Sequence, residues 1–74
     1  MKAEYVVVVE KSDTGFGAYV PDLPGCVAVG ESREETLQLI REAIELHVES
    51  LRENCEPVPS PTSTAERVVV NTAA

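Results

Sequence analysis

The sequence predicts a single α+β domain spanning residues 1–74, with elements in the order β-β-β-α-β. Three observations lead to this prediction. Valine-rich runs near both ends are typical of strands, and one long stretch has apolar residues at helical spacing. Prolines and glycines gather between them and mark turns. The expected architecture is a small, mostly antiparallel sheet with one helix on one face.

The first two strands are expected to form a hairpin. Residues 5–10, YVVVVE, are aromatic and β-branched, as strands prefer. Residues 11–15, KSDTG, form a turn cluster, and residues 16–20, FGAYV, return as the second strand. The apolar residues of the first strand do not alternate with polar ones. Both of its faces therefore need cover.

The stretch PDLPGC, residues 21–26, predicts an end to the second strand followed by a tight turn. Pro21 has no N–H to donate to a strand neighbour. Leu23-Pro24-Gly25-Cys26 fits a type II turn, because proline presets φ near −65° and glycine supplies the positive φ at the third position. Residues 26–30, CVAVG, then form a short third strand.

The helix is predicted to begin after Ser32 and to end near Glu53 or Asn54. The Ser32 side chain can accept from the Glu35 N–H while the Glu35 side chain reaches back, which is a capping box. Apolar residues then recur at helical spacing, and charged residues occupy the opposite face. The apolar residues are Leu37, Ile40, Ile44, Val48 and Leu51, widened by Leu39, Ala43 and Leu46.

The chain after the helix is predicted to be a connector followed by a fourth strand. Residues 56–64, EPVPSPTST, are rich in proline and hydroxyl residues, which favours a stiff, extended spacer. Residues 66–72, ERVVVNT, carry consecutive valines and predict the strand. One helix covers only one face of such a sheet. A second copy is the simplest cover for the rest, so we expect a homodimer or a larger homo-oligomer.

The charge and apolar content of the chain exclude some classes of function. The net charge is −7, from 6 Lys and Arg against 13 Asp and Glu, and there is no basic run. Direct binding of nucleic acid is therefore not expected, whereas a basic protein is a suitable partner. The N-terminal apolar run is too short for a signal peptide or a membrane span. We expect a cytoplasmic protein with no membrane association.

No residue pattern indicates catalysis or a cofactor. Cys26 and Cys55 form no CxxC pair, and His47 is the single histidine, so neither a metal site nor a cofactor is expected. Cys26 has no basic neighbour closer in sequence than Arg33 to lower its pKa. The glutamates of the helix are expected to form a solvent-exposed face of it. From residue chemistry alone, the sequence predicts a small binding module and not an enzyme.

In their order along the chain, these features resemble the HicB-like antitoxin family in its minimal form. The resemblance covers nearly the whole chain, from the opening valine strand through GFGAYVPDLPGCVAVGES, the REETLQLIREAIELHVESL helix, EPVPSP and RVVV. Its most specific part is the motif Pro21, Asp22, Leu23, Pro24, Gly25 and Cys26, followed by Gly30 and the helix cap of Ser32 and Glu35.

The resemblance implies a truncated ribonuclease H-like fold without catalytic acids, assembled as homodimers or tetramers. It also implies a partner: members of the family neutralise HicA toxins, small basic proteins that cleave mRNA, by covering the toxin's catalytic histidine. The acidic charge of this chain suits such a partner. We expect the contact to include the charged helix face of Arg41, Glu42, Glu45 and Glu49.

Two points in this interpretation stay open. Many members of the family carry a C-terminal DNA-binding domain that represses their own operon, whereas this sequence stops just after residues 66–72. We therefore expect the form without that domain, and any operon regulation is undetermined. The alternative function is an orphan oligomeric scaffold or regulatory subunit, with another protein or a small molecule as partner.

Overall fold

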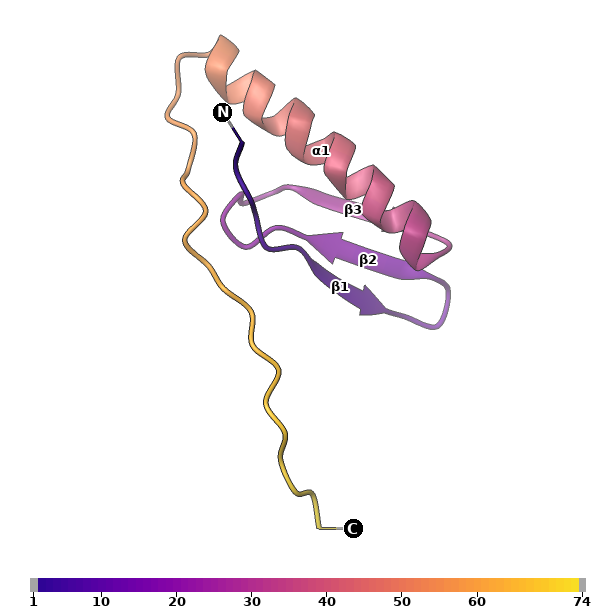
Figure 1. Ribbon diagram of the computed structural model, residues 1–74. Helices are drawn as coiled ribbons and strands as arrows, with labels where there is room; N and C mark the ends of the chain where they lie inside the picture. Colours follow the sequence, from indigo (N-terminus) through magenta and orange to yellow (C-terminus); the bar gives the residue numbers. More distant parts are fainter. Residues whose placement is uncertain (1, 74) are drawn as a thin grey trace.

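A computed structural model describes residues 2–73 as a three-stranded sheet with one helix packed on one face (Figure 1). The strands are β1 (Val8–Lys11), β2 (Phe16–Tyr19) and β3 (Val27–Gly30), and the helix is α1 (Arg33–Glu53). Both strand pairs are antiparallel, in the order β1-β2-β3. The α+β class predicted from the sequence is confirmed as three strands followed by one helix.

The register of the sheet sorts its side chains into two faces. Val9, Ala18 and Ala28 lie opposite one another on the face that α1 covers. Val8, Tyr19 and Val27 form the matching row on the other face. The sheet is therefore apolar on both faces, but within residues 2–73 only one of them is covered by the helix.

The first strand begins later than predicted, at Val8 instead of Tyr5. If the pairing of β1 with β2 continued toward the N-terminus, Val6 would lie opposite Pro21. Pro21 has no N–H to donate to the neighbouring strand. β2 accordingly ends at Tyr19, and the residues before Val8 have no neighbouring strand to pair with. The proline that ends the second strand thus also shortens the first.

The core lies between α1 and the sheet, displaced toward β3. Its buried apolar residues are Ala18, Val20, Leu23, Cys26 and Ile40. Partly buried residues around them include Val7, Val9, Ala43, Ile44 and Val48. The helix packs mainly on β3 and β2 and makes only slight contact with β1. The β1 side of the covered face is therefore left open.

The start of α1 is fixed by its cap. The Glu35 N–H donates to Ser32 Oγ at 3.1 Å, and the Glu35 carboxylate accepts from the Glu31 N–H at 2.9 Å. Thr36, fully buried, donates its hydroxyl to the Ser32 carbonyl at 2.7 Å. Together these bonds satisfy backbone groups that a bare helix end would leave unpaired.

The end of α1 is a Schellman motif. The Glu56 N–H donates to the Leu51 carbonyl at 2.8 Å, and the Cys55 N–H donates to the Arg52 carbonyl at 3.1 Å. Cys55 takes the left-handed conformation that this motif requires, with φ of 57°. Glycine usually occupies this position, so Cys55 holds a strained backbone here.

The predicted fourth strand, residues 66–72, is wrong for the isolated chain: these residues form no strand. After α1 the chain continues as an extended tail, residues 56–73, that runs past the sheet and away from it (Figure 1). A strand needs a neighbour for its N–H and C=O groups, and residues 66–72 have none within residues 2–73. Local β-propensity alone does not supply one.

Candidate binding surfaces

The PDLPGC turn is part of the core and not a free loop. The Cys26 N–H donates to the Leu23 carbonyl at 3.1 Å, and Gly25 has φ of 85°, as a type II turn with Pro24 at its second position requires. Leu23 is fully buried, although it lies in the connection between β2 and β3. The turn thus anchors the sheet by inserting a side chain beneath the helix.

Gly30 is needed for the approach of the helix to the sheet. A Cβ at this position would lie 2.5 Å from the Thr36 hydroxyl oxygen and 2.9 Å from a carboxylate oxygen of Glu35. The first turn of α1 therefore packs directly on the backbone of β3. The sequence marks Gly30 as a motif residue, but only the structure gives this reason for it.

The two cysteines lie in different surroundings. Cys26 is buried, and burial raises the pKa of its thiol, which keeps it protonated. Cys55 is an exposed free thiol at the end of α1. Residues 2–73 contain no group of three or more His, Cys, Asp or Glu side chains that could hold a metal ion.

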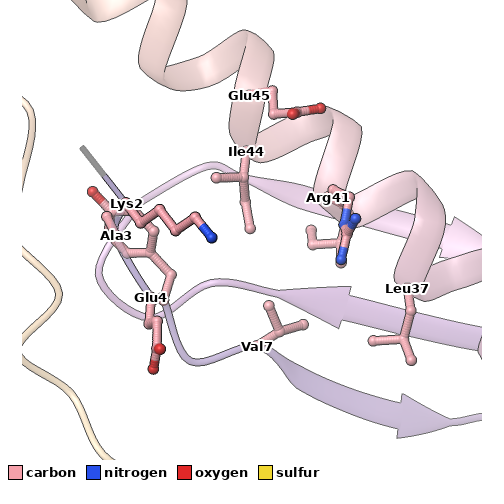
Figure 2. A pocket seen from close by; sticks show the side chains of 10 residues that line it. Lys2, Ala3, Glu4, Val7, Leu37, Arg41, Ile44 and Glu45 are labelled. Carbon is pink, nitrogen blue, oxygen red and sulfur yellow. The ribbon is translucent and has the colours of Figure 1, made fainter.

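An open groove lies between α1 and the N-terminal segment (Figure 2). Its volume is about 910 Å³. Leu37 and Ile44 point from the helix toward Val7, while Lys2, Glu4, Arg41 and Glu45 form a charged rim. The groove exists because α1 sits over β3 and leaves the β1 side of the sheet uncovered.

The predicted contact face on α1 is exposed at all four of its residues. Arg41 and Glu45 line the groove, and Glu49 lines a second hollow that continues along the same side of the helix. Glu42 lines neither hollow, and its carboxylate accepts a hydrogen bond from Gln38 Nε2 at 2.9 Å. Three of the four residues thus border two neighbouring hollows, which share Ile44 and Glu45 in their lining.

The face of the sheet opposite α1 is a second candidate surface. Tyr19, Val27 and Val29 are 41%, 63% and 77% exposed there. These side chains come from adjacent strands, β2 and β3, and lie on one face in the observed register. Exposed apolar side chains that adjoin one another are typical of protein-binding surfaces.

Asp22 ties the tail to the PDLPGC turn, a contact that sequence reasoning did not predict. Its carboxylate accepts from the backbone N–H groups of Thr62 and Ser63 at 3.0 and 2.9 Å, and from their hydroxyls at 3.2 and 2.7 Å. The bonds from Ser63 are the main reason that the pKa of Asp22 lies below its ordinary value. A second contact joins Tyr5, whose hydroxyl donates to the Pro59 carbonyl at 2.6 Å.

Comparison with known proteins places this fold in a family. The profile of the HicB_like antitoxin family of bacterial toxin-antitoxin systems matches residues 5–72. The chain belongs to this family. Its resemblance to HicB-like antitoxins, inferred above from the ordered motifs, is therefore confirmed.

Individual relatives agree with this assignment. This HicB-like chain is 48% identical over 56 residues to a UPF0150 protein of Synechocystis sp., covering 74% of this chain and 71% of that protein. It is 29% identical over 65 residues to Antitoxin HicB 2 of Photorhabdus laumondii, covering 88% of this chain and 47% of that protein. The chain thus spans about half the length of the Photorhabdus antitoxin.

A solved structure shares the fold of the HicB-like chain. It is a chain of the HicA3 and HicB3 toxin-antitoxin complex, which matches with a TM-score of 0.69 and 32% identity over 81% of this chain and 70% of that chain. No helix within residues 2–73 has the length and hydropathy needed to cross a membrane.

Proposed function

We propose that this HicB-like chain is a non-catalytic antitoxin that binds and neutralises a small basic toxin of the HicA type, an mRNA-cleaving protein. The observation that carries the proposal is the match to a chain of the HicA3 and HicB3 complex, at 32% identity and a TM-score of 0.69. Similarity at this level supports a shared mode of partner binding as well as a shared fold.

The charge of the chain supports the same partner. The net charge is −7, and α1 alone carries six glutamates against three arginines. Opposite charges on two proteins speed their encounter and bias their orientation. A basic toxin would be drawn to the helix side of this molecule.

We place the contact on the exposed helix face of Arg41, Glu42, Glu45 and Glu49. Arg41, Glu45 and Glu49 border the two hollows along α1, so a partner side chain could enter between the charges and meet the apolar floor. Apolar contact at the centre with charge at the rim is the usual anatomy of a protein interface.

The proposal is tested with the product of the adjacent reading frame, co-expressed with this chain. The expected results are rescue of growth, a stable complex on size exclusion, and loss of RNA cleavage by the toxin when this chain is added in stoichiometric amount. Absence of both binding and protection would reject the toxin partner. The alternative function, an orphan scaffold or regulatory subunit, would then remain. A rise in the Tm of this chain on adding a small-molecule ligand would support that alternative.

The contact face is tested by charge reversal. Glu45→Lys with Glu49→Lys should weaken toxin binding by at least about tenfold, mainly by slowing association at low salt. The matched control is Glu10→Lys with Asp13→Lys, which makes the same charge change on the exposed β1–β2 hairpin. Equal losses in both variants would mean that net charge, and not this face, directs binding.

A further inference from the structure

A small hollow of about 280 Å³ is lined jointly by the β1–β2 hairpin, the start of α1 and the tail. Among residues 2–73, no acidic side chain lines it, although the chain has 13 acidic residues and a net charge of −7. The proposed toxin contact does not use this hollow. Its lining consists of three cationic and three apolar residues, Lys11, Arg33 and Arg67 with Val7, Val9 and Phe16.

The apolar floor of the hollow follows from the register of the sheet. Val7 and Val9 pack beside the core on the face that α1 covers. Side chains alternate along a strand, so Lys11 points to the same face as Val9, and Phe16 lies directly opposite Lys11 on β2. Because α1 packs mainly on β3 and β2, the three apolar side chains stay partly exposed on the β1 side.

The three cations come from separate parts of the chain. Lys11 ends β1, Arg33 begins α1, and Arg67 lies in the tail. The tail is joined to the body at Ser63, four positions before Arg67, by the bonds to Asp22. All three cationic side chains are exposed. Like charges that the fold brings together repel one another, and an anion placed between them removes that repulsion.

The other hollows on this side of the molecule mix both signs of charge. The groove combines Lys2 and Arg41 with Glu4 and Glu45, and the second hollow sets Arg52 among glutamates. A hollow lined by one sign concentrates the field and attracts small ions of the opposite sign. Outside it, 6 − 3 = 3 Lys and Arg face 13 acidic residues, so the remaining surface repels a polyanion but not a single small anion.

We propose that this hollow binds a small organic phosphate, a phosphate monoester carrying one apolar ring. Two guanidinium groups and one ammonium group supply the N–H donors, and guanidinium pairs with phosphate oxygens in a fixed two-bond geometry. Phe16 and the two valines offer apolar contact to the ring. The volume of about 280 Å³ lies just below the usual range for drug-sized ligands, which limits the ligand to a small one.

The first test uses the full chain without any toxin, so its outcome is independent of the proposed function. Phenyl phosphate is titrated into the isotope-labelled protein at low salt, where charges are weakly screened. We expect saturable NMR shifts at Phe16, Arg33 and Arg67, with a dissociation constant on the order of 1 mM or tighter. Absence of saturable shifts, or shifts centred on Arg41 and Glu49, would overturn the proposal.

Further ligands separate the contributions of the ring and the phosphate. Phenol lacks the charge and inorganic phosphate lacks the ring, so each should bind at least about threefold more weakly than phenyl phosphate. Equal binding of inorganic phosphate would mean an adventitious ion only. A 5′-phosphorylated RNA trinucleotide presents the same phosphate group at the end of a polyanion. If it bound more tightly than phenyl phosphate, the small ester would be the wrong ligand.

A substitution pair provides the second test. Arg67→Gln should raise the dissociation constant of phenyl phosphate by at least about fivefold, and Arg67→Lys should restore part of the affinity. The matched control is Arg52→Gln, which removes the same charge in the last turn of α1 and should stay within about twofold of the unmodified chain. Amide spectra check that residues 8–53 stay folded. Equal losses in the two glutamine variants would show that net charge, and not this hollow, attracts the anion.

Discussion

The carboxylate of Asp22 accepts hydrogen bonds from both the backbone N–H and the hydroxyl of Ser63, 41 positions further along the chain. This contact joins the PDLPGC turn to the tail. It gives Asp22 a structural role, because its carboxylate holds Thr62 and Ser63 beside the turn.

Acidification should release the tail from Asp22. Because the folded pKa of this carboxyl is depressed below 3.8, its stabilising contribution is present above the unfolded pKa and is lost as the pH falls through the lower, folded value. The amide signals of Thr62 and Ser63 should therefore shift together with Asp22 in an NMR titration below about pH 4. In Asp22→Asn the pH dependence of these two amides should vanish, while the helix amides stay unchanged. Retention of the transition in that variant would assign it to another group.

Gly25→Val should destabilise the fold through its backbone alone. A Cβ at Gly25 meets nothing within 4 Å, so the cost comes from the φ of 85°. Gly25→Ala should lose about 1–2 kcal/mol of unfolding free energy, and Gly25→Val at least as much. Gly25→Asn is the control, since asparagine tolerates this region better and should lose less. Denaturant unfolding measures all three; equal stability of Val and Gly would exclude the positive-φ turn.

Gly30→Ala should destabilise by about 1–3 kcal/mol, because its methyl group would overlap the Thr36 hydroxyl at the start of α1. Gly17→Ala is the matched control in the neighbouring strand. There a Cβ meets only the Ala28 carbonyl oxygen at 3.9 Å, so the change should be neutral or stabilising by up to about 1 kcal/mol. A double variant with Thr36→Ala should recover part of the Gly30→Ala loss. If the losses of unfolding free energy in Gly30→Ala and Thr36→Ala simply added in the double variant, residues 30 and 36 would not be in contact.

Cys55→Gly should stabilise the protein by about 0.5–1 kcal/mol, because glycine adopts the left-handed conformation at the end of α1 without strain. Cys55→Ala also removes the thiol but keeps a Cβ, and should show no such gain. Thermal unfolding in reducing buffer compares the two. A similar rise in Tm for both would point to removal of the thiol and not to backbone strain.

Local features of the fold were predictable from the sequence, because each is determined by nearby residues. The spacing of Leu37, Ile40 and Ile44 together with the Ser32 cap placed the helix, and its observed end at Glu53 agrees. The positive φ of Gly25 followed from the Pro-Gly pair. These elements depend on periodicity and turn chemistry within a few residues.

Features that depend on distant residues were not predictable in the same way. Nothing in the sequence pairs Asp22 with Ser63, and the reason for Gly30 depends on how closely α1 approaches β3. Residues 66–72 show the limit most clearly, since their composition specifies an extended chain but not the neighbour a strand requires. The groove on the β1 side likewise arises from the sideways position of α1, which helical periodicity does not encode.

The burial of Leu23 has a practical consequence for labelling this protein. Because this side chain lies inside the core, the connection between β2 and β3 has a fixed length and would not accept inserted residues. The hairpin residues Ser12, Asp13 and Thr14 are exposed and bury no side chain. An epitope or fluorophore-binding peptide inserted there would leave α1, the β1 edge and the tail accessible for binding measurements.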